Sequence, residues 1–566
     1  MIHIRKIAAV LLAMSLLAGC GASASSISES TESVSASSKA QAKKIAYSAP
    51  GEYPITEEDI TLVIFAPSGS SYDLDENRMT LQLEEDTGIN IEWKIASAEL
   101  FMEKLQLLLA TGDRADIIAM GSEHRLTKTE ELSLAEQGII IPLEDLIDKW
   151  SVGYKAAFET LPDLRDYITA ADGHIYSLPN VDGTLNTQYP QKMWINYKWL
   201  DELDLEMPTT TDELYEVLQA FLEEDANENG DPEDEIPLAT CIDGAGVSLD
   251  SFLMAPFQLT PENKVYLQDG QPIYAPSQAG YREGLRYLHQ LYADGLIAPE
   301  SFTWTQKDLI ELNEGGDATK TGVFLGMRPD YAYDLTVYPD NSWRWEDYDS
   351  VPPLQREDGT VISAWEPYSM YHTGAAVITG MCEYPEAAFR LIDHLTLEEN
   401  TLSSIYGPKE LGWRDAVEKE YDYDGEDARI TVLEDAPANS ALGWNMGVVL
   451  TPAMAAAHTA PWRPYKPGVP SLVGCEVIIY RASAAHKEAA QLIETVLPEL
   501  AYTPEEYEEL MQLEASLSAY TAQALEAFVT GAWDIETEWT RHLTQLEKAG
   551  MGRYLKLIKT AYDRRY

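Results

Sequence analysis

The chain has 566 residues, a formal net charge of −54 and 45% hydrophobic residues. This length allows two large lobes with cores of their own. The excess of acidic residues disfavours nucleic acid and other polyanions as partners, although a local pocket can oppose the net charge.

The N-terminus has the pattern of a bacterial lipoprotein signal. Two basic residues precede an apolar run over residues 7–18, which is too short to span a bilayer as a stable helix. Leu17-Ala18-Gly19-Cys20 matches the lipobox at which such signals are cleaved. We predict that residues 1–19 are removed, that Cys20 carries a palmitate-containing lipid, and that this lipid holds the protein at the extracellular face of the cell membrane. A plain secretory signal with an incidental cysteine is the alternative.

Residues 20–50 are predicted to form a flexible tether after the lipidated cysteine. The stretch Gly21–Ser38 is mostly Ser, Ala, Gly, Glu and Thr and has no aromatic residue, so it cannot bury enough surface to order itself. As a flexible coil the tether spans about 30 Å on average. It would hold a soluble body near a membrane partner and leave it free to reorient.

The next segments alternate between strand and helix patterns. Residues Ile60–Phe65, Ile89–Ile95 and Asp116–Met120 are predicted strands, whereas Met79–Asp86 and Leu100–Ala110 are predicted helices. Strands that alternate with helices across short turns favour a mostly parallel sheet covered by helices, which is an α/β fold.

The most informative stretch begins with residues 194–200, which are predicted to form a strand. Apolar residues at helical spacing then predict a helix from Thr211 to Leu222, capped by Thr210 or Thr211, and an oxygen-rich loop follows at Asp225–Asp231. This stretch resembles the family of large extracellular solute-binding lipoproteins of sugar ABC importers. In that family an Asn-Tyr strand, a Pro-Thr-Thr cap and an acidic Asp-Glu-Ile-Pro loop follow one another in this order.

Other short segments keep the order of the same family over nearly all of residues 51–566. They include a Gly-Asp-x-x-Asp-Ile turn, a Gly-His-Ile-Tyr-Ser-Leu-Pro segment and a Pro-Pro-Leu turn, which lie at residues 112–117, 173–179 and 352–354. Each fragment is weakly specific, and the evidence is their joint order.

The resemblance implies a two-lobed periplasmic-binding-protein fold in which each lobe is a mostly parallel sheet flanked by helices, with a helical C-terminal region. Lobe 1 would comprise residues 51–185 and 375–445, and lobe 2 residues 186–374 and 446–566. A ligand held between the lobes stabilises their closed state by a hinge motion, and the permease of an ABC transporter recognises that state. We therefore expect a monomer that captures a carbohydrate, specifically an oligosaccharide, and delivers it to a permease.

The oxygen-rich loop predicts a structural calcium ion. Alternate residues from Asp225 to Asp231 carry side-chain oxygens, and Gly230 allows the sharp turn around an ion. An EF-hand would place Glu at the twelfth position, where this chain has Ile236. In the resembled family an Asp-Glu pair closes the loop, and here Asp234-Glu235 follows the Asn-Gly turn after one extra residue. The predicted ligands are Asp225, Asn227, Asn229, Asp231, Asp234 and Glu235. An exposed acidic turn is the alternative.

Aromatic residues are the candidate carbohydrate contacts, because aromatic faces stack on sugar rings. The chain has 13 Trp and 32 Tyr but only 10 Phe, which favours amphipathic aromatics. The candidates that fall near the expected crossings between lobes are Tyr176, Trp304, Trp365, Tyr368, Trp413, Trp444 and Trp462. Packing within a lobe is the alternative role for each of them.

An enzyme has little support in the sequence. The chain contains no Gly-x-Ser-x-Gly, no His-Glu-x-x-His and no glycine-rich phosphate loop. A surface glycoside hydrolase stays open as an alternative, because its two carboxylates need only be close in space. An adhesin or sensory co-receptor built on the same lobes is the other alternative.

Two further features leave a choice of interpretation. Cys241, Cys382 and Cys475 are far apart in sequence, so buried free thiols are the plain interpretation and one disulfide the alternative. The C-terminal stretch 548–565 is rich in Lys and Arg, which indicates either the solvated face of a terminal helix or a docking patch.

Overall fold

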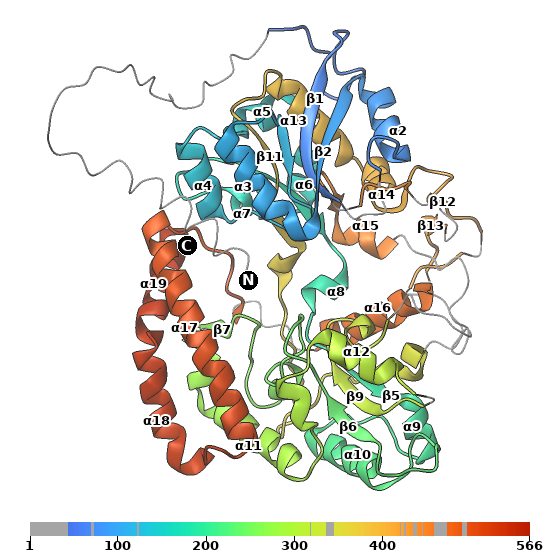
Figure 1. Cartoon of the computed structure of the whole chain (residues 1–566), viewed down its shortest axis with the longest axis vertical. Coiled ribbons are helices and arrows are strands. Elements are labelled where there is room, and N and C mark those ends of the chain that lie inside the picture. Colours follow the sequence, from blue (N-terminus) through green and yellow to red (C-terminus); the bar gives the residue numbers. More distant parts are fainter. Residues whose placement is uncertain are drawn as a thin grey trace, which may run out of the picture. The chain divides into compact units, whose positions relative to one another are not determined.

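The computed structural model describes residues 44–68, 73–121, 124–316, 318–334, 344–418, 420–423, 426–433, 439–443, 445–457, 472–489 and 495–565. The predicted signal, Cys20, most of the tether, Trp444 and Trp462 lie outside the described residues. The described chain divides into two compact units (Figure 1). Unit 1 takes its residues from Met1–Val181, His372–Trp413 and Leu433–Val449, and unit 2 from Asp182–Tyr371, Arg414–Val432 and Leu450–Tyr566.

A six-stranded sheet forms the centre of unit 1. Its strands, in spatial order, are β14 (Val449–Leu450), β4 (Leu178–Asp182), β11 (Tyr371–Ile378), β3 (Ile117–Ala119), β1 (Thr61–Ser68) and β2 (Asn90–Ser97). Strand β1 runs parallel to β2 and to β3, whereas β11 runs antiparallel to β3. Consecutive residues of β1 and β3, such as Ile117 and Ile118, are buried, which is typical of a sheet covered on both faces.

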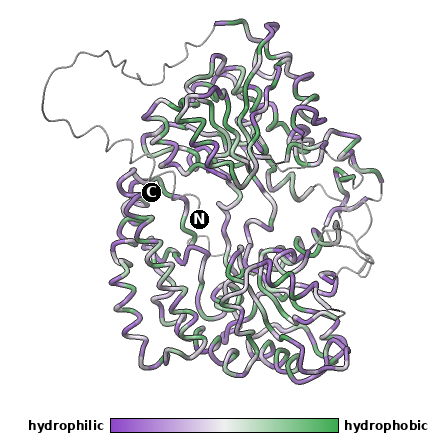
Figure 2. Tube along the Cα trace, viewed as in Figure 1, coloured by the Kyte–Doolittle hydropathy of each residue, from purple (hydrophilic) through white to green (hydrophobic). Residues whose placement is uncertain are grey.

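Helices flank the sheet of unit 1, and hydrophobic residues concentrate along its strands (Figure 2). The helices are α2 (Arg78–Thr87), α3 (Phe101–Thr111), α4 (Lys128–Glu136), α5 (Glu144–Trp150), α6 (Gly153–Thr160), α7 (Leu164–Ile168), α13 (Pro385–Leu395) and α14 (Glu398–Tyr406). Helix α2 shows why these residues form helices. Asn77 Oδ1 accepts a hydrogen bond from the backbone N–H of Met79 at 2.9 Å, and Gly88, with φ at +69°, ends the helix in the left-handed conformation that glycine tolerates.

A four-stranded sheet forms the centre of unit 2. Its strands, in spatial order, are β10 (Tyr348–Ser350), β5 (Met193–Asn196), β9 (Thr321–Leu325) and β6 (Ile236–Ala239). Strands β6 and β9 are parallel, but β5 is antiparallel to both β9 and β10. The sheet is therefore mixed rather than mostly parallel.

Unit 2 contains seven described helices before its C-terminal region. They are α8 (Leu185–Gln188), α9 (Tyr197–Glu202), α10 (Thr211–Glu223), α11 (Ala279–Ala293), α12 (Gln306–Glu314), α15 (Pro452–Ala457) and α16 (Leu472–Glu488). The strand expected over residues 194–200 stops at Asn196, and this part of the prediction is wrong. The Asn196 side chain accepts from the backbone N–H groups of Lys198 (3.1 Å) and Trp199 (3.3 Å), so it caps helix α9 instead of continuing the strand.

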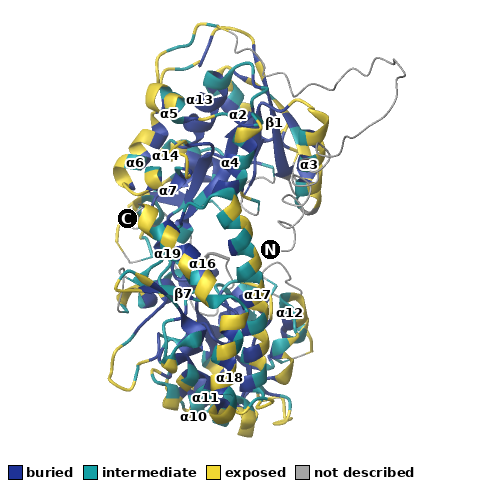
Figure 3. Cartoon of the chain, turned by 90° about the vertical axis from the view of Figure 1, so that its left-hand side faces the viewer, coloured by how far each residue is buried: buried dark blue, intermediate teal, exposed yellow. Residues whose placement is uncertain are grey.

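The C-terminal region consists of three long helices beside a small hairpin, as the sequence predicts for a helical end. The helices are α17 (Pro504–Val529), α18 (Ile535–Lys548) and α19 (Met551–Arg565), and the hairpin strands are β7 (Val265–Gln268) and β8 (Gln271–Tyr274); a second small sheet pairs β12 (Trp413–Asp415) with β13 (Ile430–Val432). The outer faces of α17 and α18 carry many exposed residues (Figure 3). Arg553 pairs with Glu509 and Arg564 with Glu506, which favours a solvated, charge-balanced face over a docking patch.

The three described cysteines, Cys241, Cys382 and Cys475, are buried free thiols, and no disulfide joins them. Burial raises the pKa of the Cys241 thiol to about 11, so this cysteine is a packing residue rather than a reactive one. Within the described ranges, no helix has both the length and the apolar character needed to cross a membrane.

Candidate functional site

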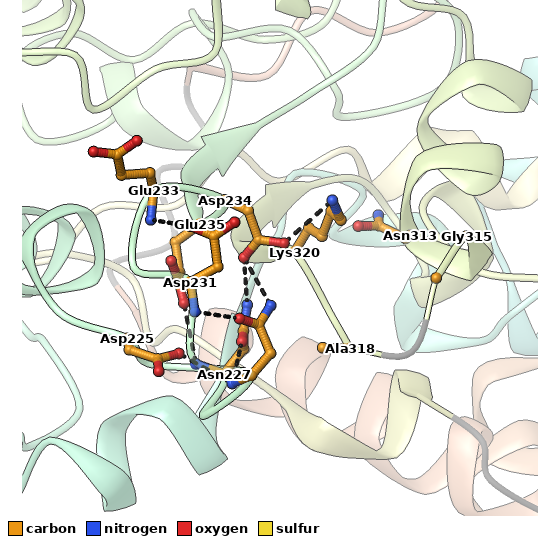
Figure 4. Close-up of polar contacts among 12 residues, drawn as sticks. Asp225, Asn227, Asp231, Glu233, Asp234, Glu235, Asn313, Gly315, Ala318 and Lys320 are labelled. Carbon is orange, nitrogen blue, oxygen red and sulfur yellow. Dashed lines mark hydrogen bonds and ion pairs between the residues drawn. The ribbon is translucent and has the colours of Figure 1, made fainter.

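The oxygen-rich loop lies in unit 2 between α10 and β6, and its residues fold back on themselves. The Asp225 carboxylate accepts from the backbone N–H groups of Asn229 (3.1 Å) and Gly230 (2.9 Å). Asn227 Oδ1 accepts from Asn229 N at 3.0 Å, and Asn229 Oδ1 accepts from Asp231 N at 2.7 Å. Gly230 has φ at +87°, as the sharp turn requires. The side-chain oxygens are thereby held in a compact turn (Figure 4).

Glu235 closes the loop from the start of β6. Its Oε1 accepts from the backbone N–H of Asn227 at 3.3 Å, whereas its Oε2 is buried and has no hydrogen-bond partner among the described residues. The Glu235 residue is only 6% exposed. Burial raises the pKa of its carboxyl group, and the charges of Asp234 and Asp225 add to this effect. A buried carboxylate oxygen without a donor is the feature that a bound cation would satisfy.

Within the described residues, both carboxylate oxygens of Asp234 have partners, whereas only one oxygen of Glu235 has one. Its Oδ1 accepts from the side-chain amides of Asn227 (3.0 Å) and Asn229 (2.9 Å), and its Oδ2 lies 3.2 Å from the Lys320 ammonium. Burial alone would raise the pKa of Asp234, but the two amide hydrogen bonds and the ammonium lower the pKa below its usual value. Sequence reasoning missed Lys320, since only the pairing of β6 with β9 brings it to the loop.

The donor set fits a hard divalent cation. Oxygen ligands from carboxylates, amides and backbone carbonyls are those that calcium prefers, and the loop offers all three kinds. Across the described residues, no three His, Cys, Asp or Glu side chains are gathered closely enough to hold a metal ion by themselves. A site here therefore depends on the two Asn side chains and on backbone oxygens in addition to the carboxylates.

Two of the predicted carbohydrate contacts, Tyr176 and Trp413, are buried in unit 1. Tyr176 is 7% exposed, and its hydroxyl donates to Asp172 Oδ2 at 2.7 Å. Trp413 is 3% exposed, and its indole N–H donates to Ser403 Oγ at 3.1 Å. Both side chains already have packing and hydrogen-bond partners inside this unit.

The other three described candidates, Trp304, Trp365 and Tyr368, are half-buried residues of unit 2. Trp304 packs against a buried cluster that includes Cys241. The Tyr368 ring lies 6.4 Å from the Tyr371 ring, centroid to centroid. The indole Nε1 of Trp365 is buried and has no acceptor among the described residues. This buried indole N–H of Trp365 is left available for a ligand hydroxyl.

Glu366, the neighbour of Trp365, is a candidate that the sequence did not single out. Its backbone N–H donates to Gln188 O at 2.9 Å, and its Oε1 accepts from the backbone N–H of Glu262 at 3.2 Å. Burial raises the pKa of its carboxyl group to about 7, and the Glu262 charge adds to the shift. The only sequence signal was a carboxylate directly after a Trp, which is weak in a chain with 94 acidic residues.

Two known proteins are similar to this chain in sequence. FusA of Streptococcus pneumoniae, a fructooligosaccharide ABC transporter substrate-binding protein, is 28% identical over 526 residues, which cover 90% of this chain and 91% of FusA. Lipoprotein LipO of Bacillus subtilis is 30% identical over 155 residues, 26% of this chain and 31% of LipO.

Solved structures of similar proteins match this chain along about nine-tenths of its length. FusA in complex with kestose, and an EF-hand mutant of FusA in complex with fructo-nystose, each give a TM-score of 0.66 at 25% identity and cover 89% of this chain and 99% of FusA. An HMO-binding, ABC-transporter associated solute-binding protein from Bifidobacterium longum infantis shares the fold, with a TM-score of 0.71 at 21% identity over 90% of this chain and 99% of its own. Residues 79–401 match the family model for bacterial extracellular solute-binding proteins, and the chain belongs to that family.

Proposed function

We propose that the protein is a lipid-anchored solute-binding protein that captures an oligosaccharide outside the cell and delivers it intact to the permease of an ABC importer. The observation that carries this proposal is the similarity to FusA along nine-tenths of both chains, together with family membership. Fructooligosaccharides are the first ligands to test, since FusA is a fructooligosaccharide binder. The lipid anchor rests on the lipobox at Cys20, and LipO is a relative that carries the name lipoprotein.

The two units are proposed to be the ligand-binding lobes. A ligand that contacts both lobes only in the closed state shifts the equilibrium toward closure by its extra contacts. The chain passes between the units after Val181, Tyr371, Trp413, Val432 and Val449, and the first two positions are proposed as hinges. In unit 2, Glu366 N–H donates to Gln188 O at 2.9 Å, and Ser369 Oγ donates to Thr187 O at 2.5 Å, so the two segments beside these positions are tied together.

The proposed ligand contacts differ in whether they must give up existing packing or hydrogen bonds before they can contact a sugar. Trp365 can offer its unpartnered indole N–H, and Glu366 its carboxylate, to neighbouring sugar hydroxyls without breaking any described hydrogen bond. Trp304 and Tyr368 stay proposed as half-buried aromatic contacts. Tyr176 and Trp413 would each have to leave a packed position, and Trp444 and Trp462 are proposed from the sequence alone.

The oxygen-rich loop is proposed to hold a structural calcium ion. Asp225, Asn227, Asn229 and Glu235 would supply side-chain oxygens, and Asp231 and Asp234 complete the predicted set. A bound calcium ion would neutralise the loop's carboxylates and cross-link the end of α10 to the start of β6. The carbohydrate is proposed to bind elsewhere, so the ion contributes stability rather than ligand chemistry.

A binding experiment separates a carrier from an enzyme. We expect kestose or nystose to raise the melting temperature of the purified protein, because a ligand that binds only the folded state stabilises it by about 2.7 kcal/mol at 100 times its Kd. Chromatography after the melt should recover the oligosaccharide intact. Steady conversion to fragments would establish a glycoside hydrolase instead, and the absence of any stabilisation across a wide glycan panel would remove the carbohydrate from the proposal.

A further inference from the structure

Strand pairing fixes Lys320 beside the oxygen-rich loop. The backbone N–H of Ile236 donates to Lys320 O at 2.7 Å, and the parallel register then pairs Ile236 with Thr321. Ile236 directly follows Asp234 and Glu235, so the β6–β9 pairing brings Lys320 next to both acids. The Lys320 ammonium lies 3.2 Å from Asp234 Oδ2, and its side chain is 34% exposed (Figure 4).

The segment before Lys320 is held independently of the loop. Arg344 donates to the backbone carbonyls of Asn313 (2.6 Å), Gly316 (2.5 Å) and Ala318 (3.3 Å). These hydrogen bonds satisfy carbonyls at the C-terminal end of α12 and fix the turn that leads into β9. The backbone just before Lys320 is therefore held by Arg344 rather than by residues of the loop.

Asp234 orients the loop's two amides. Because both of its Oδ1 hydrogen bonds come from Asn227 and Asn229, it turns each Nδ2 group toward itself and leaves each Oδ1 on the other side. Its second oxygen faces Lys320. Both oxygens of Asp234 are thus occupied, whereas Glu235 Oε2 is buried without a partner in the described chain.

We propose that Lys320 is a built-in counter-ion of this loop: it pairs with Asp234, holds the loop together when no divalent cation is bound, and competes with calcium for the Asp234 carboxylate when one is present. Asp234 is then the carboxylate that Lys320 and calcium would share. The ion would be held by Asp225, the two Asn side chains and Glu235, together with Asp234. This inference deepens the proposed calcium site and is independent of the proposed carbohydrate.

The experiment compares Lys320→Met with Lys307→Met in the full-length mature protein. Lys307 lies on α12 and pairs with Glu311 on the solvent face at 3.3 Å, so its removal makes the same change in net charge away from the loop. We expect Lys320→Met to lower the melting temperature in chelator and to tighten calcium binding by about two- to fivefold, the range that an exposed ion pair accounts for. Lys320→Arg should restore the wild-type behaviour, and Lys307→Met should change neither quantity.

Asp234→Asn provides the second arm, with calcium binding measured by titration calorimetry. We expect this variant and Glu235→Gln each to weaken calcium binding, and we expect Lys320→Met to have no further effect when combined with Asp234→Asn. Wild-type calcium affinity in Asp234→Asn would show that calcium does not use this carboxylate and would overturn the proposal. Equal behaviour of Lys320→Met and Lys307→Met would overturn it too, as would an absence of calcium binding in every variant. A parallel melt with kestose reports on carbohydrate binding separately.

Discussion

The carboxyl group of Glu366 has a different pKa in the folded and unfolded chain, which makes the stability of the protein depend on pH. Its pKa is about 7 in the folded protein, because burial and the nearby Glu262 charge disfavour the carboxylate, against 4.5 as the ordinary value. The folded state therefore binds this proton more tightly than the unfolded state. The resulting stabilisation is fully present below about pH 4.5 and is lost as the pH rises through 7.

We predict that Glu366→Gln, which cannot ionise, removes this part of the pH dependence. The variant should match the wild type near pH 4.5 and melt at a higher temperature at pH 8. Melting curves from pH 4.5 to 8 provide the measurement, and Glu357→Gln at an exposed position serves as the control for the lost charge. Parallel curves for the wild type and Glu366→Gln would show that Glu366 does not titrate in this range.

Trp365 is the aromatic residue at which ligand binding is most directly tested. Replacing it with Ala should weaken oligosaccharide binding by about 1–3 kcal/mol if the ring stacks on a sugar. Calorimetry on the variant and on Trp365→Phe, which keeps a ring but lacks the indole N–H, separates stacking from hydrogen bonding. Unchanged affinity in Trp365→Ala would return this residue to a packing role.

Trp413→Ala is expected to lower the free energy of unfolding by about 3–5 kcal/mol, because the side chain is buried.

At the scale of one element, the α10–β6 loop is the part whose metal dependence can be isolated. Asp225→Ala combined with Asn229→Ala should abolish calcium-dependent stabilisation, because both residues would supply ligand oxygens and both hold the turn together. Ligand preference should stay unchanged, because the carbohydrate is proposed to bind elsewhere. Melting temperatures with calcium and with chelator give the result, and Glu216→Ala with Gln219→Ala on α10, which also removes one charge and one amide, is the matched control. A wild-type melting temperature that is the same with calcium and with chelator would mean that the loop is only a solvated turn.

Local patterns predicted most of the individual elements. The helix expected over Thr211–Leu222 is α10 at Thr211–Glu223, capped by Thr210 through a reciprocal pair with Glu213, and the strand expected over Ile60–Phe65 is β1 at Thr61–Ser68. The periodicity and the capping chemistry of these segments are contained within a few residues, which explains why sequence reasoning found them. The strand expected beyond Asn196 failed because a cap and a strand continuation compete at that residue.

Long-range pairing was not predictable in the same way. The mixed direction of the unit 2 sheet depends on how β5 meets β9 and β10, which follow it more than a hundred residues later in the sequence. Lys320 reaches the loop only because β6 pairs with β9, and Glu366 acquires its raised pKa only through burial beside Glu262. The loop's own donors were visible as alternating oxygens, whereas these tertiary partners carried no local signal.

At the scale of the whole molecule, the anchor is a separate prediction. Cys20→Ser should release the protein from the membrane fraction and abolish lipid labelling, because the lipidated thiol is the only strong attachment that the sequence indicates. Fractionation of cells that express both forms provides the measurement, with Cys241→Ser, at a buried free thiol, as the control. Unchanged fractionation and labelling of Cys20→Ser would contradict the lipoprotein assignment.

The central claim is that two units close over an intact oligosaccharide, and small-angle X-ray scattering tests it most directly. The radius of gyration of the mature protein should fall when kestose or nystose is added, and should recover when the ligand is removed by dialysis, with the oligosaccharide recovered unchanged. Sucrose-free buffer and an unrelated glycan such as cellobiose serve as controls for ligand-independent effects. A radius that stays constant at saturating ligand, or an oligosaccharide recovered as fragments, would contradict the account.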